Sequence, residues 1–143
     1  MKIKTGIYIS GSITHDPDFV KKFELAANLL QKQVPDADIF NPAAHQNIPA
    51  VGLTEEELWA KYLCRDLCVL IKMRDEHEIA ILVSMPGHRT SKGASLERAF
   101  AESIGFHLMD IRDALPDWDQ RLAAVLPTKP ELRSYSPKRG GKK

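Results

Sequence analysis

Short apolar runs alternate with longer amphipathic stretches along the chain, and turn-forming residues separate them. Apolar runs of this kind are typical of strands, whereas apolar residues repeating every three or four positions are typical of helices. The runs predict strands at residues 2–10, 37–40, 78–84 and 106–111. The stretches between and after them predict helices at residues 17–34, 54–73, 91–103 and 115–126.

Capping residues set the predicted helix boundaries. Asp16 and Pro17 read as a cap followed by proline at the first helical position, and Thr54 with Glu57 reads as a capping box. Gly105 is a natural stop for the third helix. Residues 43–53 show no periodicity and predict a loop. The apolar row predicted for the first helix is Val20, Phe23, Ala27, Leu30 and Val34.

Strands that alternate with helices predict an α/β domain with a mainly parallel sheet. The expected fold is a Rossmann-like (flavodoxin-like) three-layer sandwich with four to five strands. Ligands of such sheets bind outside the carboxyl ends of the strands, near the point where the strand order reverses. Three segments that follow strands are expected at that edge: Gly11-Ser12, Asn41-Pro42 and the loop 85–93.

Composition narrows the class of protein without naming a function. Hydrophobic residues make up 43% of the chain and charged residues 27%, as in an ordinary globular domain. The net charge of +1 gives no reason to expect nucleic-acid binding. Residues 129–143 hold six basic residues against one acidic residue, a net charge of +5 that leaves −4 on the rest of the chain. One domain at residues 1–127 and a basic, disordered tail at residues 128–143 are therefore expected.

Two cysteines and the amino-terminal sequence indicate in which cellular compartment the protein is expected. Cys64 and Cys68 stand one helical turn apart in an apolar stretch, and no Cys/His set completes a metal site around them. We therefore expect buried, reduced thiols and no bound metal. The first residues lack the apolar core of a signal peptide, and no apolar run approaches membrane-spanning length. A cytoplasmic protein without membrane attachment is expected.

Two acidic residues fall on helix faces that should carry only apolar side chains. Buried carboxylates are rare unless they are paired or functional, because removing a charge from water is costly. The two acidic residues therefore suggest a functional site. The alternatives are a structural ion pair with Arg65, Arg89 or Arg98, or exposure to solvent if the helix is one residue out of the predicted phase. The two helical rows are Gly93, Glu97, Phe100/Ala101, Ile104 and Trp59, Tyr62/Leu63, Asp66/Leu67, Leu70.

Two segments after strands offer backbone N–H groups and hydroxyls to an anion. Gly11-Ser12-Ile13-Thr14 follows the first strand, and Ser91 and Gly93 open the third predicted helix. Each is a weak signal alone, because such segments also serve as plain turns and caps. Together with two inward carboxylates they fit a phosphorylated sugar held beside an acid pair. Tyr8 is a candidate to orient the attacking carboxylate, with a core aromatic as the alternative.

These residues resemble the nucleoside 2-deoxyribosyltransferase superfamily, which includes the 2′-deoxynucleoside 5′-monophosphate N-glycosidases. The resemblance covers residues 3 to about 110 and rests on the order and spacing of three motifs. Ser91 stands six residues before Glu97, where the monophosphate hydrolases carry a phosphate-binding serine and the transferases an aspartate. The motifs are Ile7-Tyr8-Ile9-Ser10-Gly11-Ser12-Ile13, then Tyr62-Leu63-Cys64-Arg65-Asp66-Leu67, then Ser91-Lys92-Gly93-Ala94-Ser95-Leu96-Glu97.

The resemblance implies an enzyme that hydrolyses the N-glycosidic bond of a nucleoside 5′-monophosphate without a cofactor. It implies that Glu97 is the nucleophile or electrostatic partner at the anomeric carbon, Asp66 the proton handler or a ligand of a sugar hydroxyl, and Tyr8 the residue that orients Glu97. Phosphate or substrate contacts are implied for Gly11, Ser12, Ile13, Asn41, His88, Ser91 and Gly93.

Two alternatives to the hydrolase function stay open. One is a deoxyribosyltransferase that acts on free nucleosides. The other is a non-catalytic nucleotide sensor, which is favoured by Thr14-His15-Asp16, where the hydrolases carry glycine and arginine. The resemblance also implies a homodimer or higher homo-oligomer in which a neighbour completes the pocket.

Overall fold

Four parallel strands form one sheet at the centre of the structure, a computed structural model that describes residues 3–13, 16–87 and 91–126. The strands are β1 (Thr5–Ser10), β2 (Asp38–Phe40), β3 (Ile79–Ser84) and β4 (His107–Asp110), in the order β2-β1-β3-β4. The order reverses between β1 and β3, whose register pairs Ser10 with Ser84. The predicted α/β fold with a parallel sheet is confirmed.

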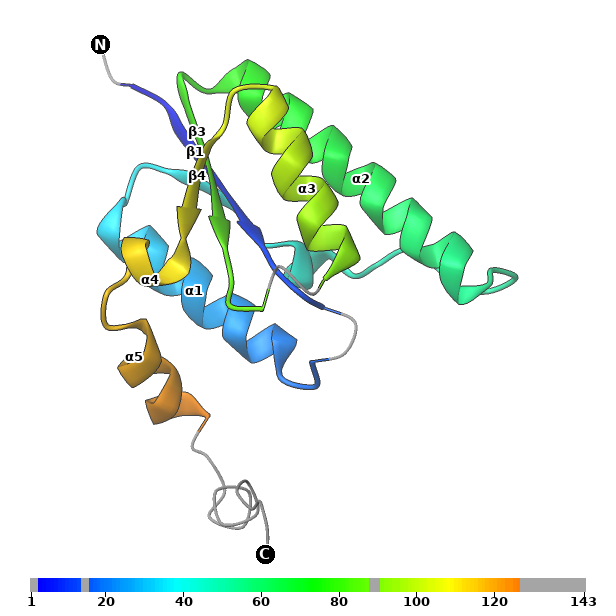
Figure 1. The fold of residues 1–143 in the computed structure, drawn as a ribbon, viewed down its shortest axis with the longest axis horizontal. Coiled ribbons are helices and arrows are strands. Elements are labelled where there is room, and N and C mark those ends of the chain that lie inside the picture. The colour runs from blue at the N-terminus through cyan, green and yellow to red at the C-terminus, as the bar shows by residue number, and fades with distance from the viewer. Residues whose placement is uncertain (1–2, 14–15, 88–90, 127–143) are drawn as a thin grey trace, which may run out of the picture.

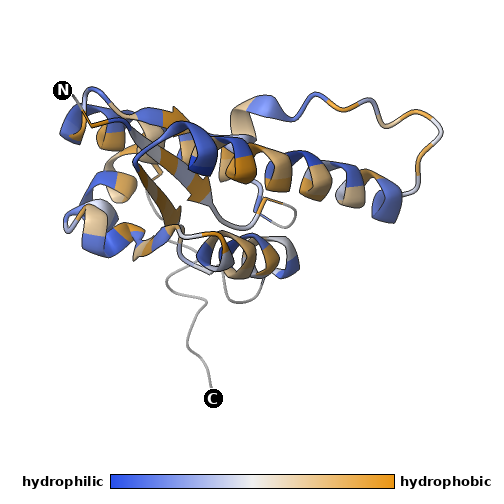
Figure 2. Cartoon of the chain, turned by 90° about the horizontal axis from the view of Figure 1, so that it is seen from above, coloured by the Kyte–Doolittle hydropathy of each residue, from blue (hydrophilic) through white to orange (hydrophobic). Residues whose placement is uncertain are grey.

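Helices cover both faces of this sheet and make it the middle of three layers (Figure 1). One face carries α1 (Phe19–Gln33), α4 (Ile111–Ala114) and α5 (Trp118–Val125), and the other carries α2 (Glu55–Glu76) and α3 (Lys92–Ser103). Figure 2 shows the hydrophobic strands enclosed between helices that expose hydrophilic residues. Within the described residues, no helix is both long and apolar enough to cross a membrane.

Each face of the sheet has its own hydrophobic core, because side chains alternate along every strand. On the α1 side, Ile7 and Ile9 pack with Phe23 and Trp118. On the α2 side, Tyr8 and Leu82 pack with Leu70 and Phe106. Odd positions of β1 therefore face α1 and even positions face α2, which puts Tyr8 and Ser10 on the side of the two inward carboxylates.

The first helix differs from its prediction in start and in phase. It begins at Phe19, and the Asp16 carboxylate accepts a hydrogen bond from the Asp18 N–H at 2.9 Å, so the chain turns before the helix starts. Its buried residues are Phe23, Ala26 and Leu30. Val20 is 52% exposed, because the preceding residue, Phe19, is the one in helical phase with the buried row and packs against the core. The prediction that Val20 faces the core was wrong.

The second helix confirms its predicted cap. The Thr54 side chain accepts a hydrogen bond from the Glu57 N–H, and the Glu57 carboxylate accepts one from the Thr54 N–H. The helix ends at Glu76, three residues later than predicted. Cys64 and Cys68 are free and exposed, so the prediction of buried thiols was wrong. They lie about 200° around the helix from Asp66 and Leu70, on the outward face.

Sequence periodicity missed two short helices. A 3₁₀ helix, η1 (Pro42–His45), lies within the predicted loop. The second is α4 (Ile111–Ala114), which lies before the last predicted helix and starts where the Asp110 side chain accepts a hydrogen bond from the Arg112 N–H. The last predicted helix itself is α5, which begins at Trp118, three residues later than predicted. Pro116 follows α4 and lacks the N–H that a continuing helix would need.

A buried histidine joins α2 to the edge of the sheet. The two ring nitrogens of His77 lie 2.8 Å from the Met73 carbonyl oxygen and 2.7 Å from an Asp38 carboxylate oxygen in β2. Gly6 lies beneath this contact, and a Cβ there would come within 2.6 Å of the Met73 side chain. The close approach of α2 to β1 therefore requires a residue without a side chain at position 6.

Candidate active site

Glu97 lies on the buried face of α3, as its position in the sequence predicted. Ser91 caps this helix, since its hydroxyl accepts a hydrogen bond from the Ala94 N–H at 3.2 Å. Ala94, Glu97 and Ala101 share the side of the helix that faces the sheet, and Glu97 is only 7% exposed. The helical phase thus forces a carboxyl group into the interior.

Asp66 lies on the buried face of α2, in one row with Leu70 and Met73, and is 4% exposed. The Arg65 Nε donates a hydrogen bond to Asp66 Oδ1 at 2.7 Å. The ion pair considered for the carboxylates therefore exists for Asp66. Glu97 has no such partner among the described residues; the Ser10 hydroxyl donates to Glu97 Oε1 at 3.0 Å.

The two carboxyl groups interact, and burial shifts both of their pKa values upward. Burial is the main cause that raises the pKa of Glu97 to about 8, and the negative charge of Asp66 adds to it. Burial also raises the pKa of Asp66, although Arg65 opposes that shift. Paired carboxyls with displaced pKa values are characteristic of acid–base sites, because one group can hold a proton while the other is charged.

Tyr8 lies against both carboxyls from β1. Burial raises the pKa of its hydroxyl well above the usual value, and the charges of Glu97 and Asp66 contribute further. The hydroxyl is buried, and no hydrogen-bond partner for it lies within the part of the chain described. Ser10, two residues farther along the same face of β1, makes the hydrogen bond to Glu97. Strand alternation from Tyr8 was a signal that could have identified Ser10.

An aromatic stack borders the acid pair on the side of β2. The Phe40 ring lies between the rings of Tyr8 and His45, with centroid distances of 5.4 and 4.9 Å. The Arg65 guanidinium lies over the rings of Phe40 and Tyr62 and donates a hydrogen bond to the His45 carbonyl. From the sequence, Arg65 is expected only as an ion-pair partner, and no pattern in the sequence predicts a role at the site for Phe40, His45 or Tyr62.

The predicted phosphate-binding residues lie in the segments that follow β1, β2 and β3. Gly11 packs closely, since a Cβ would come within 2.6 Å of Met85 Cβ, and Ile13 packs on the α1 side. Asn41 caps η1, with its side-chain oxygen accepting a hydrogen bond from the Ala43 N–H at 3.0 Å. Gly93 is the second residue of α3. His88 lies outside the described residues, as does the predicted basic tail.

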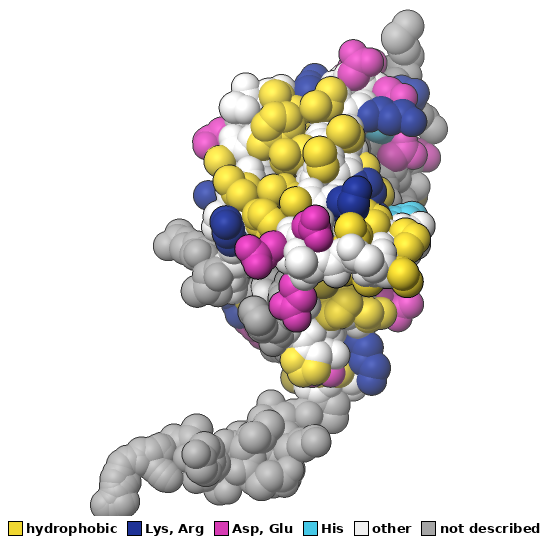
Figure 3. Space-filling model, turned by 90° about the vertical axis from the view of Figure 1, so that its right-hand side faces the viewer, with side chains coloured by type: hydrophobic (Ala, Val, Ile, Leu, Met, Phe, Trp, Pro, Cys, Tyr) yellow, Lys and Arg dark blue, Asp and Glu magenta, His cyan; other side chains and the backbone are white. Residues whose placement is uncertain are grey.

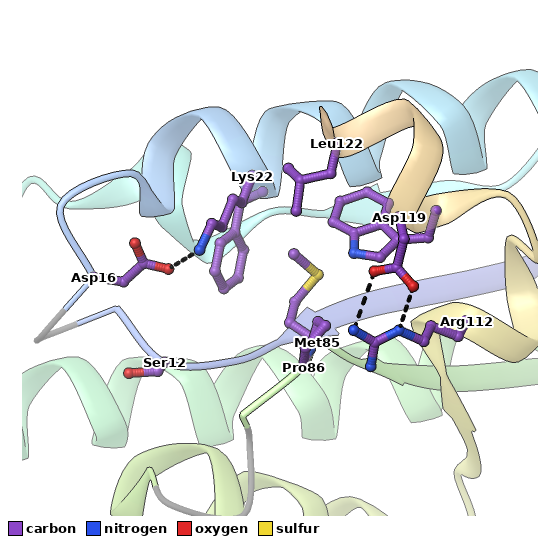
Figure 4. Close-up of a pocket in the computed structure, with 10 residues that line it drawn as sticks. Ser12, Asp16, Lys22, Met85, Pro86, Arg112, Asp119 and Leu122 are labelled. Carbon is purple, nitrogen blue, oxygen red and sulfur yellow. Dashed lines mark hydrogen bonds and ion pairs between the residues drawn. The ribbon is translucent and has the colours of Figure 1, made fainter. Parts of the chain in front are cut away.

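A pocket opens between α1 and α5 on the face of the sheet opposite the acid pair (Figure 4). Two ion pairs line it: Lys22 with Asp16 at 2.8 Å, and Arg112 with Asp119 at 3.0 Å. Ser12 lies at its edge, two residues beyond Ser10. Among the residues predicted to bind phosphate, Ser12 therefore lines this pocket and also lies just beyond the carboxyl end of β1.

The structure brings together the three predicted catalytic residues, Tyr8, Asp66 and Glu97, at the carboxyl end of the sheet on its α2 side. Within residues 3–13, 16–87 and 91–126, no group of three acidic, histidine or cysteine side chains could hold a metal ion. The fold and site thus define a Rossmann-like α/β domain with a buried acid pair.

Residues 5–110 match a protein family described as a domain of unknown function, DUF4406, and the chain belongs to that family. The matched region contains all four strands and the whole acid pair. No curated protein and no solved structure matched the chain.

Proposed function

We propose that this protein hydrolyses the N-glycosidic bond of a nucleoside or deoxynucleoside 5′-monophosphate, releasing the free base and the sugar 5-phosphate. The observation that carries the proposal is the pair of buried, interacting carboxyls, Asp66 and Glu97, beside the carboxyl end of β1. The resemblance to the 5′-monophosphate N-glycosidases supports the same substrate class.

The chemistry of this bond suits the site. Cleavage develops positive charge on the sugar and negative charge on the departing base. A carboxylate stabilises the first charge, and a protonated acid neutralises the second. A buried acid pair with displaced pKa values provides both groups at neutral pH. Burial also excludes bulk water, which strengthens each electrostatic interaction.

The phosphate is proposed to lie between the start of α3 and the loop after β1. The amino terminus of a helix attracts anions, and α3 is capped at its amino terminus by Ser91, six residues before Glu97. Ser12 follows β1, the strand adjacent to β3 from which the α3 segment leaves. A nucleotide spanning these two segments would bring its sugar to the acid pair.

A nucleoside 5′-monophosphate should be cleaved at least about a hundredfold more efficiently than its nucleoside, because hydrogen bonds to a charged group contribute about 1.5–3 kcal/mol each. Ser91→Asp should erase this preference by repelling the phosphate. The measurement is kcat/KM on both substrates. Ser91→Asn is the matched control, since aspartate and asparagine both cap helices well but only aspartate is charged.

A panel of mononucleotides and nucleosides with detection of the free base separates the candidate functions. Base released from monophosphates supports the hydrolase. Equal or better activity on free nucleosides would overturn the hydrolase and favour a deoxyribosyltransferase. Nucleotide binding without any base release would leave a sensor, the function favoured by Thr14-His15-Asp16 in the first loop.

We also propose that the protein forms a homodimer through α2. The first turns of α2 and the segment before it project beyond the sheet, and hydrophobic side chains gather in a broad patch on this side of the molecule (Figures 1, 2 and 3). Ile71 is 51% exposed and Cys64 is exposed. Coiled-coil spacing of three and four residues relates Glu57, Ala60, Cys64, Leu67, Ile71 and Arg74.

This row is complementary to itself when two copies run antiparallel. Ala60 then faces Ile71 of the partner subunit, a small residue against a large one, and Glu57 faces the partner subunit's Arg74, opposite charges. Light scattering should find a dimer, and Ile71→Asp should shift it to monomer by burying an unpaired charge. Val125→Asp is the control, because Val125 is 48% exposed in α5, on the opposite face of the sheet, and the variant should leave the dimer intact. A monomeric parent would exclude this interface.

A further inference from the structure

The two members of the acid pair have different neighbours. Asp66 receives a hydrogen bond from a cation, the Arg65 guanidinium, at 2.7 Å. Glu97 receives one from a neutral donor, the Ser10 hydroxyl, at 3.0 Å. The titratable groups that act on Glu97 are Asp66 from α2 and Tyr8 from β1, while Arg65 acts on Asp66 and on Tyr8. Among the residues that the structure describes, one cation therefore lies beside the two carboxyls, and it forms a hydrogen bond with only one of them.

Arg65 is held firmly in this position by other contacts. Its guanidinium lies 5.7 Å from the centroid of the Phe40 ring and 5.2 Å from that of Tyr62, and it donates to the His45 carbonyl. Arginine suits such a place, because its planar group can stack on rings and donate several hydrogen bonds at once. The side chain cannot easily turn from Asp66 to Glu97 without losing these contacts.

Two interacting buried carboxyls cannot both ionise beside a single cation, since the second negative charge would be uncompensated. We infer that the resting pair carries one proton, held on Glu97, and that Arg65 is the positioning residue that keeps it there by stabilising the charge on Asp66. Burial and the Asp66 charge, which together raise the pKa of Glu97 to about 8, agree with this placement.

The consequence for mechanism rests on the proposed glycosidase function. The Glu97 O–H proton passes to a nitrogen of the departing base as the bond between C1′ and the base breaks, and the bonding electrons stay with the base. The Asp66 carboxylate stabilises the resulting positive charge on the sugar. Water then forms the new bond to C1′, and its displaced proton returns to the acid pair and restores neutral Glu97. This order reverses the roles that the family resemblance implies for Asp66 and Glu97.

The test is to follow each carboxyl by NMR across a pH titration of the whole protein, with ¹³C-labelled aspartate and glutamate side chains. Glu97→Gln and Asp66→Asn assign the two signals. At pH 7 the Glu97 signal should have the protonated position and the Asp66 signal the ionised one. This readout needs no substrate, so it stands or fails independently of the glycosidase activity.

Arg65→Gln should move the Asp66 signal toward its protonated position and the Glu97 signal toward its ionised position at the same pH. Arg65→Lys should restore the parent pattern, because it returns the charge without the ring contacts. Arg121→Gln, which breaks an exposed ion pair on α5, is the control and should change neither signal. Where glycosidase activity is measured, kcat/KM should fall above about pH 8 in the parent as Glu97 loses its proton.

Three results would overturn the inference. One is a parent Glu97 signal that is already ionised at pH 7. Another is an Asp66 signal that Arg65→Gln leaves unchanged. The third is an Arg65→Lys variant that behaves like Arg65→Gln, which would mean that packing of the guanidinium, and not its charge, places the proton. Absence of base release with the predicted NMR pattern would overturn the glycosidase function alone.

Discussion

Glu97→Gln lowers kcat/KM on any nucleotide that the parent cleaves by at least about a hundredfold, or roughly 2.7 kcal/mol of transition-state stabilisation. Glutamine keeps the shape of glutamate and can still accept the hydrogen bond from Ser10. It can neither give up a proton nor carry a negative charge, so the loss is expected whichever role Glu97 has. The measurement is steady-state kinetics with detection of the released base.

Glu102→Gln is the matched control for this experiment. Glu102 lies in the same helix as Glu97 but is exposed, so the variant makes the same chemical change away from the site. It should retain the activity of the parent. Parent-like turnover by Glu97→Gln would show that Glu97 is a structural residue and that the site has been placed wrongly.

The second large effect is on stability and depends on pH. The pKa of Glu97 is about 8 in the folded protein, against an ordinary value near 4.3 in the unfolded chain. Between these values the unfolded state releases a proton that the folded state keeps, so the free energy of unfolding falls as the pH rises. Below the lower value both states are protonated, and the contribution of Glu97 is fully present.

Glu97→Gln should remove this loss, because glutamine does not titrate. The variant should therefore gain stability relative to the parent as the pH rises from about 4.5 to about 8, by an amount on the order of a few kcal/mol. Thermal unfolding in a series of buffers measures it as a growing difference in Tm. Parallel Tm curves for the two proteins across this range would mean that Glu97 is not held protonated by the fold.

Much of the fold could be predicted because local signals and tertiary structure agree in this chain. The capping box at Thr54 and the continuous apolar run of β3 each specify their element without help from distant residues. The inward phase of Asp66 and Glu97 was predictable for the same reason, since helical periodicity alone places them. The end of the chain was harder, because the side chain of Asp110 starts a helix where the apolar pattern continued a strand.

The surroundings of the acid pair could not be predicted, since they depend on contacts between distant parts of the chain. Arg65 lies over Phe40, which is 25 positions earlier, and the carbonyl that it contacts belongs to a 3₁₀ helix that periodicity missed. Cys64 was misplaced because the stretch around it is rich in apolar residues, whereas in the structure its helical phase puts it on the outward face. The sequence therefore identifies Asp66 and Glu97 as acidic residues of the site, but it does not show that Arg65 pairs with Asp66 and not with Glu97.

The two outer strands of the sheet also bear on how the protein avoids aggregation. A strand at the edge of a sheet presents unpaired backbone groups that can recruit a strand from another molecule. Here β2 has three residues and β4 has four, against six in each of the two inner strands. Asp38 places a carboxylate at the start of β2, and β4 turns directly into α4. Either edge therefore offers another chain only a short ladder of hydrogen bonds.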